Sequence, residues 1–442
     1  MRRNVLLLQG PVGPFFRNFA QELEHNGFCV YKINFNGGDK LYFSGERVFD
    51  YRDTLTEWRS YLERFLQTYD IGRIYLFGDC RFYHKVARTV AEENNVRLFV
   101  FEEGYIRPNF ITLEETGVNG YSALLDKTLD LSKSPLPEEY PQKFLDRVFR
   151  NMVVYAMSYY LASSVLSFRF PDYVHHRPLA PLSEGGKWLL SVFRKAKYQL
   201  QQKHLIKRFA GSLHDRYFLC PLQVHCDMQI TAHSDFTSVE HFIGEVVASF
   251  AKHADPRHSL VFKHHPMDRG YTNYSTLIEK LAHEYGVENR LYYVHDLDLP
   301  AMLKSARGTV LINSTVGMSS LLHDTPVKTL GRAIYDRAEL TSQVDLDEFW
   351  LNPGGVDKQA YAAFRDHLIL KNQINGSFYR RLSGINTPTG LEWTLEMLQD
   401  HRFTPDRVDS SKRPTLQVVA GRDLDSQTVE RTPPTPGKVA SR

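Results

Sequence analysis

The sequence predicts an α/β protein with two Rossmann-like, doubly wound domains that face each other across a cleft. Short apolar runs alternate with amphipathic helical stretches, which is the pattern of βαβ units and parallel sheets. This alternation stops near residue 140 and begins again after residue 215. The chain has 442 residues, more than the roughly 250–300 at which one hydrophobic core stops growing. Two domains are therefore expected.

In the first half, each predicted strand ends in a polar or glycine-rich turn. The strands are expected at 5–8, 28–35, 74–77 and 96–101, with helices at 15–23 and 55–69. Ligands of open parallel sheets collect beyond the carboxyl ends of the strands. The turn residues Gln9, Gly10, Asn36, Asp39, Asp79 and Arg81 are therefore candidate cleft residues, although such residues often only form turns.

The second half repeats this pattern and sets the domain boundaries. Strands are expected at 217–222, 260–262, 291–294 and 309–312, with a helix from Val239 to Phe250. The expected units are a first domain at 1–140, a helical membrane-proximal segment at 141–214, a second domain at 215–403 and a disordered tail at 404–442. The tail is rich in Pro, Ser, Thr and charge and has little to bury.

The segment between the domains has an unusual charge pattern. Residues 151–168 contain no charged side chain but are too few to cross a membrane, so a buried or interfacial helix is expected. Residues 187–208 hold seven cations and no carboxylate, accompanied by Trp188 and Phe193. A stretch of this kind suits an anionic membrane surface, while a solvated basic helix is the alternative.

Composition excludes several classes of protein. A formal net charge of +3, from 54 basic and 51 acidic residues, does not indicate nucleic-acid binding. The four cysteines form no CxxC pair, which argues against a disulfide framework or a zinc site and fits a reducing compartment. The apolar run in the N-terminal sequence MRRNVLLLQG is too short for a signal peptide. A cytoplasmic protein without a bound metal is expected.

The run EEGYIRP at 102–108 is the first candidate for chemistry. Glu102 and Glu103 lie at the end of a predicted parallel strand, where a carboxylate can act as nucleophile or base, with Arg107 nearby. Successive strand residues face opposite ways, so one glutamate is expected in the site and the other at the turn. Two solvated loop glutamates are the alternative.

Two further turns of the second half suit phosphate binding. The run KHHPMDRG brings Lys263, His264, His265, Pro266 and Arg269 to one strand-to-helix turn. In NSTVG, the hydroxyls of Ser314 and Thr315 either cap a helix or bind a nucleotide phosphate. Surface histidines are the alternative for the first turn. Neither a GxGxxG motif nor a P-loop is present, so NAD and ATP are weakly supported.

Seven motifs together resemble a known family. They are QGPVGPFF, FNGGDK, FGDCR, FEEGYIRP, QVHCDMQ, KHHPMDRG and INSTVG, in this order along the chain. The chain thereby resembles the capsular polysaccharide biosynthesis proteins of the KpsS type, a group of bacterial transferases of 3-deoxy-D-manno-octulosonic acid (Kdo). The resemblance runs from about residue 4 to about residue 380 and excludes the tail.

The resemblance implies a GT-B glycosyltransferase that uses CMP-Kdo as donor. Such proteins add the first β-Kdo to a phosphatidylglycerol-type lipid at the cytoplasmic face of the inner membrane, beside other capsule biosynthesis and export proteins. Glu103 occupies the aspartate position of the family's E-D-G-[FY]-x-R motif, whose carboxylate is thought to attack the anomeric carbon. His265-Pro266 and Ser314-Thr315 match the CMP-binding motifs, and Arg107 or Arg269 would hold the Kdo carboxylate.

Two other functions stay open on the sequence. One is an inverting sialyl- or Kdo-transferase that uses a CMP-sugar and another acceptor. The other is a non-catalytic scaffold for capsule assembly or export, against which the intact carboxylate, His-Pro and Ser/Thr motifs argue. Which of Glu102 and Glu103 is the nucleophile also stays open.

Overall fold

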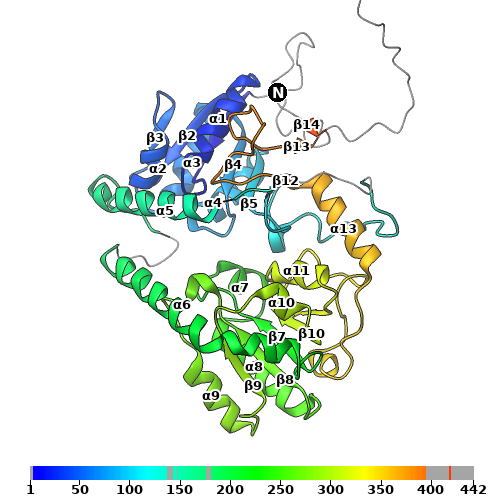
Figure 1. The fold of residues 1–442 in the computed structure, drawn as a ribbon. Coiled ribbons are helices and arrows are strands. Elements are labelled where there is room, and N and C mark those ends of the chain that lie inside the picture. Colours follow the sequence, from blue (N-terminus) through cyan, green and yellow to red (C-terminus); the bar gives the residue numbers. More distant parts are fainter. Residues whose placement is uncertain (1–2, 137–142, 147, 176–180, 395–417, 420–442) are drawn as a thin grey trace, which may run out of the picture.

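The computed structural model describes residues 3–136, 143–146, 148–175, 181–394 and 418–419. Within them the chain forms two α/β lobes, each built on its own sheet, with long helices along one side (Figure 1). The predicted fold class of two Rossmann-like domains is confirmed. The tail expected at 404–442 lies outside the described residues except for 418–419.

The first lobe contains a seven-stranded sheet in the order β12-β6-β5-β4-β1-β2-β3. The strands are β1 (Asn4–Leu7), β2 (Cys29–Asn34), β3 (Val48–Asp50), β4 (Ile71–Phe77), β5 (Arg97–Glu103), β6 (Phe110–Glu115) and β12 (Gln373–Asn375). From β3 to β5 all neighbours pair in parallel, while β6 and β12 are antiparallel additions at the edge. The four predicted strands are present, and β3, β6 and β12 were missed.

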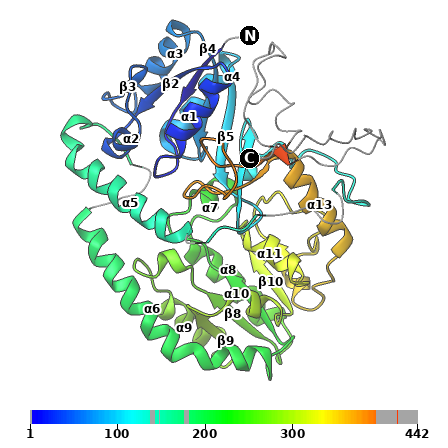
Figure 2. The same cartoon turned by 45° about the horizontal axis from the view of Figure 1, so that its top comes forward.

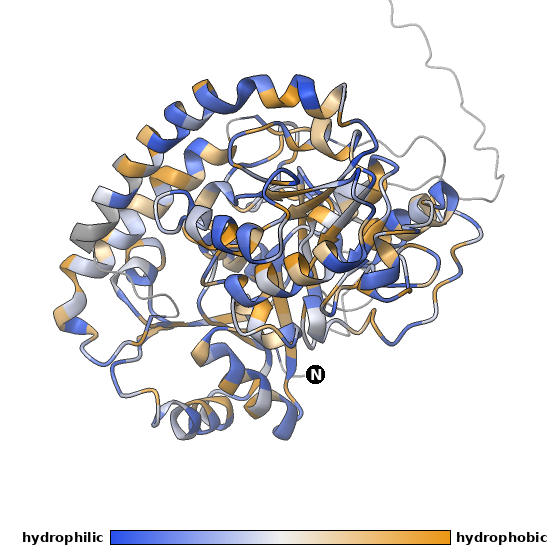
Figure 3. Cartoon of the chain, turned by 90° about the horizontal axis from the view of Figure 1, so that it is seen from below, coloured by the Kyte–Doolittle hydropathy of each residue, from blue (hydrophilic) through white to orange (hydrophobic). Residues whose placement is uncertain are grey.

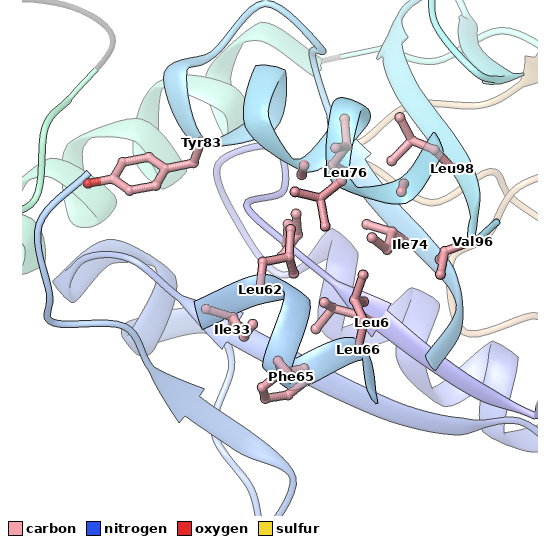
Figure 4. Packing of buried hydrophobic residues seen from close by; sticks show 14 of the residues in the cluster. Leu6, Ile33, Leu62, Phe65, Leu66, Ile74, Leu76, Tyr83, Val96 and Leu98 are labelled. Carbon is pink, nitrogen blue, oxygen red and sulfur yellow. The ribbon is translucent and has the colours of Figure 1, made fainter. Parts of the chain in front are cut away.

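Helices cover both faces of this sheet. They are α1 (Phe15–His25), α2 (Gly37–Tyr42), α3 (Trp58–Thr68) and α4 (Phe82–Glu93), followed by the 3-10 turn η1 (Asn119–Tyr121). Alternate residues of β1 enter two different cores, since Val5 packs with α1 whereas Leu6 packs with α3 and α4. Figure 4 shows the second core, where Leu62 and Leu66 of α3 meet Leu6 and Ile74 of the sheet. Alternation with a period of two thus buries the sheet on both faces.

The end of the described chain returns to the first lobe. Strand β12 pairs with β6, and Phe378 and Trp393 complete the core around α1. Beyond them, β13 (Trp393–Thr394) pairs with β14 (Val418–Val419). The sheet pairing therefore differs from the expected second domain at 215–403, because its last stretch supplies an edge strand and apolar side chains to the first lobe.

The second lobe contains a five-stranded parallel sheet in the order β11-β10-β7-β8-β9. Its strands are β7 (Tyr217–Pro221), β8 (Ser259–Lys263), β9 (Leu291–Val294), β10 (Gly308–Leu311) and β11 (Val327–Thr329). Its helices are α7 (Met228–His233), α8 (Val239–His253), η3 (Pro266–Asp268), α9 (Ser275–Glu284), α10 (Leu299–Leu303), α11 (Val316–Leu322), α12 (Leu346–Phe349) and α13 (Lys358–Lys371). Ser238 caps α8 through a hydrogen bond from the His241 N–H, and the apolar stripe of α8 packs under the sheet as predicted.

Two helices connect the lobes along one side of the molecule. They are α5 (Val148–Val165), which is followed by the turn η2 (Ser167–Arg169), and the long α6 (Pro181–Ala210). Figures 1 and 2 show α5 against the first lobe and α6 along the second. The expected helical segment at 141–214 thus corresponds to a pair of helices, one on each lobe.

An apolar cluster also joins the lobes on the opposite side. Tyr105 and Leu124 of the first lobe pack with Leu311 and Met318 of the second and with Phe364 of α13. In addition, the Arg337 guanidinium donates to the carbonyl oxygens of Leu124 and Lys127. These contacts fix the two sheets relative to each other.

Candidate active site

The two candidate carboxylates end β5 and contact different neighbours, as expected for successive strand residues. One oxygen of Glu102 accepts the backbone N–H of Glu103 at 3.0 Å. Burial raises the pKa of Glu102 to about 7, and the nearby charges of Glu103 and Asp79 add to the rise. Glu103 instead accepts a hydrogen bond from the Tyr379 hydroxyl at 3.1 Å. The pair therefore combines a carboxyl that titrates near neutrality with one that is oriented by a phenol.

Arg107 does not take the expected place beside Glu103. Its Nε donates to the carbonyl oxygen of Gly104 at 3.1 Å, and the side chain is exposed. No ion pair joins these two described residues, because the chain turns back at Gly104 to form β6 and directs the guanidinium onto its own turn. Tyr379, and not Arg107, is therefore the described side chain that hydrogen-bonds to this carboxylate.

The cleft candidates of the first two turns lie together but under a helix. Gln9, Asn36 and Asp39 are buried, and all three hydrogen-bond to the Tyr159 hydroxyl of α5. Tyr159 receives a bond from Gln9 at 2.9 Å and from Asn36 at 2.8 Å, and donates to Asp39 at 2.9 Å. Asn36 also caps α2, so the predicted turn at 36–39 begins a helix. These residues therefore hold α5 in place.

The remaining candidates of the first lobe make contacts that stabilise its own turns. Asp79 is buried and accepts the N–H of Val118, which anchors the loop before η1. Burial raises the pKa of Asp79. Arg81 donates to Gln9 at 2.9 Å and to the Gly10 carbonyl at 3.4 Å. A side chain at position 10 would collide with the Phe16 ring, so Gly10 is required by packing.

In the second lobe, the strand β8 and the turn after it bury the first part of the motif KHHPMDRG. Lys263 donates to the His295 carbonyl at 3.2 Å, and burial lowers the pKa of this lysine. His264 is 2% exposed and its Nδ1 lies 2.6 Å from the Tyr293 hydroxyl. Burial lowers the pKa of His264 to about 4, which keeps the imidazole neutral. The alternative of surface histidines is therefore wrong for His264.

In the rest of the motif, His265 and Pro266 are accessible, whereas Arg269 is buried and paired with a carboxylate. His265 is partly exposed, and its Nδ1 accepts the Met267 N–H at 3.2 Å, so the imidazole caps η3. Pro266 begins η3 and is exposed. Arg269 is buried and forms an ion pair with Asp296. Of the two arginines considered for a sugar carboxylate, Arg269 thus already has a carboxylate partner.

The segment QVHCDMQ connects the motifs of the second lobe. His225 Nδ1 lies 2.5 Å from a carboxylate oxygen of the fully buried Asp268. Gln223 donates to Asn313 at 3.1 Å, which links the segment to the NSTVG turn. Sequence reasoning named none of these as site residues. The signal was present, because the segment follows β7, the central strand of the sheet between β8 and β10.

The two hydroxyls of the NSTVG turn have different roles. Ser314 precedes the N-cap residue Thr315, and its Oγ accepts the first N–H of α11, that of Val316, at 3.3 Å. Thr315 makes no capping bond with its side chain and lines a pocket between the lobes. The pocket is lined by both lobes, with Tyr105 and Asn119 on one side and Asn313, Thr315 and Arg332 among the residues on the other.

Direct contacts place the two sets of motifs at one interface. Gln229 Nε2 donates to the sulfur of Cys80 at 3.8 Å, and His233 Nε2 lies 3.9 Å from the same sulfur. Position 120 of η1 must be glycine, since a Cβ there would overlap the His233 ring. The turn that holds Asp79 and Arg81 thus faces α7 of the second lobe, which begins within the segment QVHCDMQ.

The described residues contain neither a metal-binding cluster nor a membrane-spanning helix. No three His, Cys, Asp or Glu side chains converge there as they would around a metal ion. Within the same residues, no helix combines the length and the apolar character that a membrane crossing needs.

The comparisons with known proteins agree with the motif pattern. Residues 73–379 match the family described as capsule polysaccharide biosynthesis protein. The capsule polysaccharide export protein KpsS of Escherichia coli is 40% identical over 378 residues, or 85% of this chain and 97% of that protein. The capsule polysaccharide modification protein LipB of Neisseria meningitidis serogroup B is 37% identical over 394 residues, or 87% and 94%. Among solved structures, the beta Kdo 2,7 transferase KpsC of Thermosulfurimonas dismutans is 12% identical with a TM-score of 0.38, covering 81% of this chain and 90% of that one.

The family match covers more than half of the chain. The alignments with KpsS and LipB cover nearly the full length of those two proteins. This chain therefore belongs to the capsule polysaccharide biosynthesis protein family.

Proposed function

We propose that the protein is a glycosyltransferase that transfers Kdo from CMP-Kdo to a phosphatidylglycerol-type lipid. The transfer retains the β configuration and starts the poly-Kdo linker of a capsular polysaccharide. One observation carries the proposal. The lobe that holds the two carboxylates of β5 contacts the lobe that holds the His-Pro and Ser/Thr motifs, at a single interface. Membership of the capsule family supports the pathway, and a partner among other capsule biosynthesis and export proteins is consistent with it.

The donor is assigned to the second lobe. CMP-Kdo carries one phosphodiester charge, which the accessible His265 and the neighbouring Lys263 can stabilise as CMP leaves. The hydroxyl of Thr315 makes no helix-capping hydrogen bond, so it can donate to the nucleotide in the pocket between the lobes. In this proposal protein side chains balance the charge of the leaving group, and no metal is required.

The catalytic step is assigned to the carboxylate pair. Glu103 attacks the anomeric carbon of Kdo and expels CMP, which gives a covalent sugar–enzyme ester. The acceptor hydroxyl then attacks the same carbon, regenerates the Glu103 carboxylate and gives its proton to Glu102. A group with a pKa of about 7, as burial gives Glu102, is suited to take and release a proton at neutral pH. Two displacements retain the configuration.

The sugar carboxylate is assigned to Arg107. This guanidinium is exposed, and its one described hydrogen bond goes to Gly104. Arg269 is already paired with Asp296 and buried, so a second carboxylate there would require breaking an ion pair. A two-pronged contact from Arg107 to the Kdo carboxylate would place the anomeric carbon close to the end of β5.

An inverting CMP-sugar transferase is the second candidate, and one observation favours it. A single displacement needs a general base and no nucleophile, and Glu102 has the pKa of such a base. In that reaction the acceptor hydroxyl attacks directly, and Glu103 serves only to orient the sugar. The configuration of the product, determined by NMR, separates the two reactions.

The lipid acceptor implies work at a membrane surface, and we propose a peripheral position on the cytoplasmic face of the inner membrane. The basic stretch 187–208 lies in α6, where Lys195 and Lys197 are exposed. Arg194 is different, since it donates to the backbone carbonyl of Arg269 at 2.8 Å. The side chain of Trp188 lies outside the described part of the structure. A membrane role is therefore assigned to the lysines and not to Arg194.

The test is transfer by the purified protein from CMP-Kdo to a synthetic phosphatidylglycerol acceptor in detergent. We expect a β-linked product from the wild type, loss of several orders of magnitude in rate for Glu103→Gln, and unchanged activity for the exposed control Glu57→Gln. No product from the folded wild type that still binds CMP would favour a scaffold without activity. An active Glu103→Gln variant would exclude Glu103 as the nucleophile.

A further inference from the structure

Helix α5 presents an apolar stripe to the outside of the molecule. Val154, Met157, Leu161 and Val165 follow each other at steps of three and four residues and therefore share one face. Their exposed fractions are 61%, 66%, 66% and 63%. Phe168 in η2 extends the stripe and is 74% exposed. No other described part of the chain buries this row, and a row of this kind on a soluble surface marks an interaction site.

The opposite face of α5 is fixed to the first lobe, so the helix cannot turn its stripe inward. Tyr159 is 5% exposed and forms the hydrogen bonds to Gln9, Asn36 and Asp39 described above. Ser163 accepts the N–H of Gly38 at 3.1 Å. Both faces of α5 are thus defined, one by polar anchoring and the other by exposed apolar side chains.

Positive charge lies beside the stripe. The helices α5 and α6 contact each other and follow the same side of the molecule in Figures 1 and 2. On α6, Lys195, Lys197, Lys203 and Lys207 are exposed, and no carboxylate occurs between residues 187 and 208. Phe193 and Leu200 of the same helix are 67% and 70% exposed. In Figure 3 the ribbon of α6 accordingly carries hydrophilic and hydrophobic residues side by side at the rim.

We propose that the α5 stripe inserts into the surface of an anionic phospholipid bilayer, parallel to the membrane plane, with the α6 lysines facing the headgroups. Helices that lie in a membrane interface combine an apolar face with neighbouring cations in this way. The inference deepens the proposed function, on which it rests for the lipid nature of the acceptor. It assigns the insertion to α5, for which the sequence left open a buried or an interfacial helix.

Charge favours a lipid surface over a second copy of the chain. A symmetric dimer through this side would bring the lysines of one α6 close to those of the other, and such like charges repel. An anionic leaflet instead neutralises them, with each exposed lysine adding to the attraction. The apolar stripe supplies the part of the binding that salt does not screen.

The experiment is flotation of the full-length protein with vesicles of equal parts phosphatidylglycerol and phosphatidylcholine. The test variant is the double change Met157→Asp, Leu161→Asp. The matched control is Leu322→Asp, Leu351→Asp, because these leucines of the second lobe are 58% and 59% exposed and lie outside α5 and α6. We expect the test variant to lose about tenfold or more in vesicle affinity, since two apolar side chains no longer leave water. The control should bind as the wild type does.

A second readout distinguishes insertion from adsorption. In Leu161→Trp, brominated lipids should quench the added tryptophan, whereas Leu322→Trp should show no added quenching. Equal affinity of the test variant and the wild type, or equal losses in test and control variants, would overturn the proposal. Sedimentation that shows wild-type dimers and monomers of the test variant would do so as well, and would identify a second copy as the occupant.

Transfer assays separate this inference from the proposed function. The test variant should keep its activity on an acceptor in detergent and lose it on the same acceptor in vesicles. If no transfer occurs in either setting, the proposed function fails, while flotation still reports on the stripe.

Discussion

Replacing Glu102 by glutamine should make the protein more stable at alkaline pH but not at acidic pH. Burial raises the pKa of Glu102 to about 7, so the folded state holds this proton more tightly than the unfolded chain does. Stability from such a group is fully present below the unfolded pKa and is lost as pH rises through the folded pKa. Glutamine resembles the protonated acid and can still accept the Glu103 N–H, and it pays no cost of ionisation.

The magnitude follows from the two pKa values. The ordinary value of 4.5 and the folded value of about 7 differ by about 2.5. At about 1.4 kcal/mol for each pH unit, this difference is about 3 kcal/mol once the pH exceeds 7. At pH 4.5 and below, wild type and variant should differ by less than about 0.5 kcal/mol.

The assay is urea unfolding of wild type and Glu102→Gln at pH 5 and at pH 8.5, followed by tryptophan fluorescence. Glu57→Gln is the control for loss of an exposed carboxylate, and its effect should stay within about 0.5 kcal/mol at both pH values. A stability difference for Glu102→Gln that does not change with pH, or that grows toward acid, would refute the assignment of a raised pKa.

Four further outcomes are expected. His265→Ala should weaken CMP binding by about ten- to a hundredfold in calorimetry while the fold is kept, since one charge-assisted hydrogen bond is removed; unchanged affinity would contradict this. Glu103→Gln should bind CMP normally and show no covalent Kdo adduct in intact-protein mass spectrometry, whereas the wild type does; an adduct on the variant would point to another nucleophile. Tyr159→Phe should lower the free energy of unfolding by about 1–3 kcal/mol in urea, because Asp39 loses a donor in a buried site. Changing Lys195 and Lys197 to Glu should reduce flotation with anionic vesicles most at low salt, and a loss that does not depend on salt would contradict an electrostatic role.

The main features of the fold could be read from the sequence because local patterns determine them. Strands of the first sheet are apolar on both faces, as buried parallel strands are, and Val5 and Leu6 serve two different cores. The helix at 239–253 follows from its apolar spacing and its Ser238 cap. Of the polar turns at the strand ends, the one with Asp79 and Arg81 lies at the interface of the lobes, whereas Gln9, Asn36 and Asp39 pack under α5.

Contacts between distant segments could not be read in this way. Tyr379 bonds to Glu103 across 276 positions, and β12 joins the first sheet only after the chain has completed the second lobe. The three-residue strand β12 carries too short a pattern to predict its partner. Arg107 was placed beside Glu103 because the two are close in sequence, yet the turn at Gly104 directs it elsewhere.

The last described segment of the chain runs from the second lobe back to the first, so the position of the Glu103 side chain depends on both lobes. Helix α13 packs through Phe364 and Leu368 on the second lobe, and β12 follows it after a single residue. Four residues after β12, the hydroxyl of Tyr379 contacts Glu103 on the first lobe. The segment that orients this carboxylate is therefore anchored at the lobe that carries the His-Pro and Ser/Thr motifs. Because the nucleophile candidate and its phenol lie 276 positions apart with the second lobe between them, their geometry requires both lobes to be folded and joined.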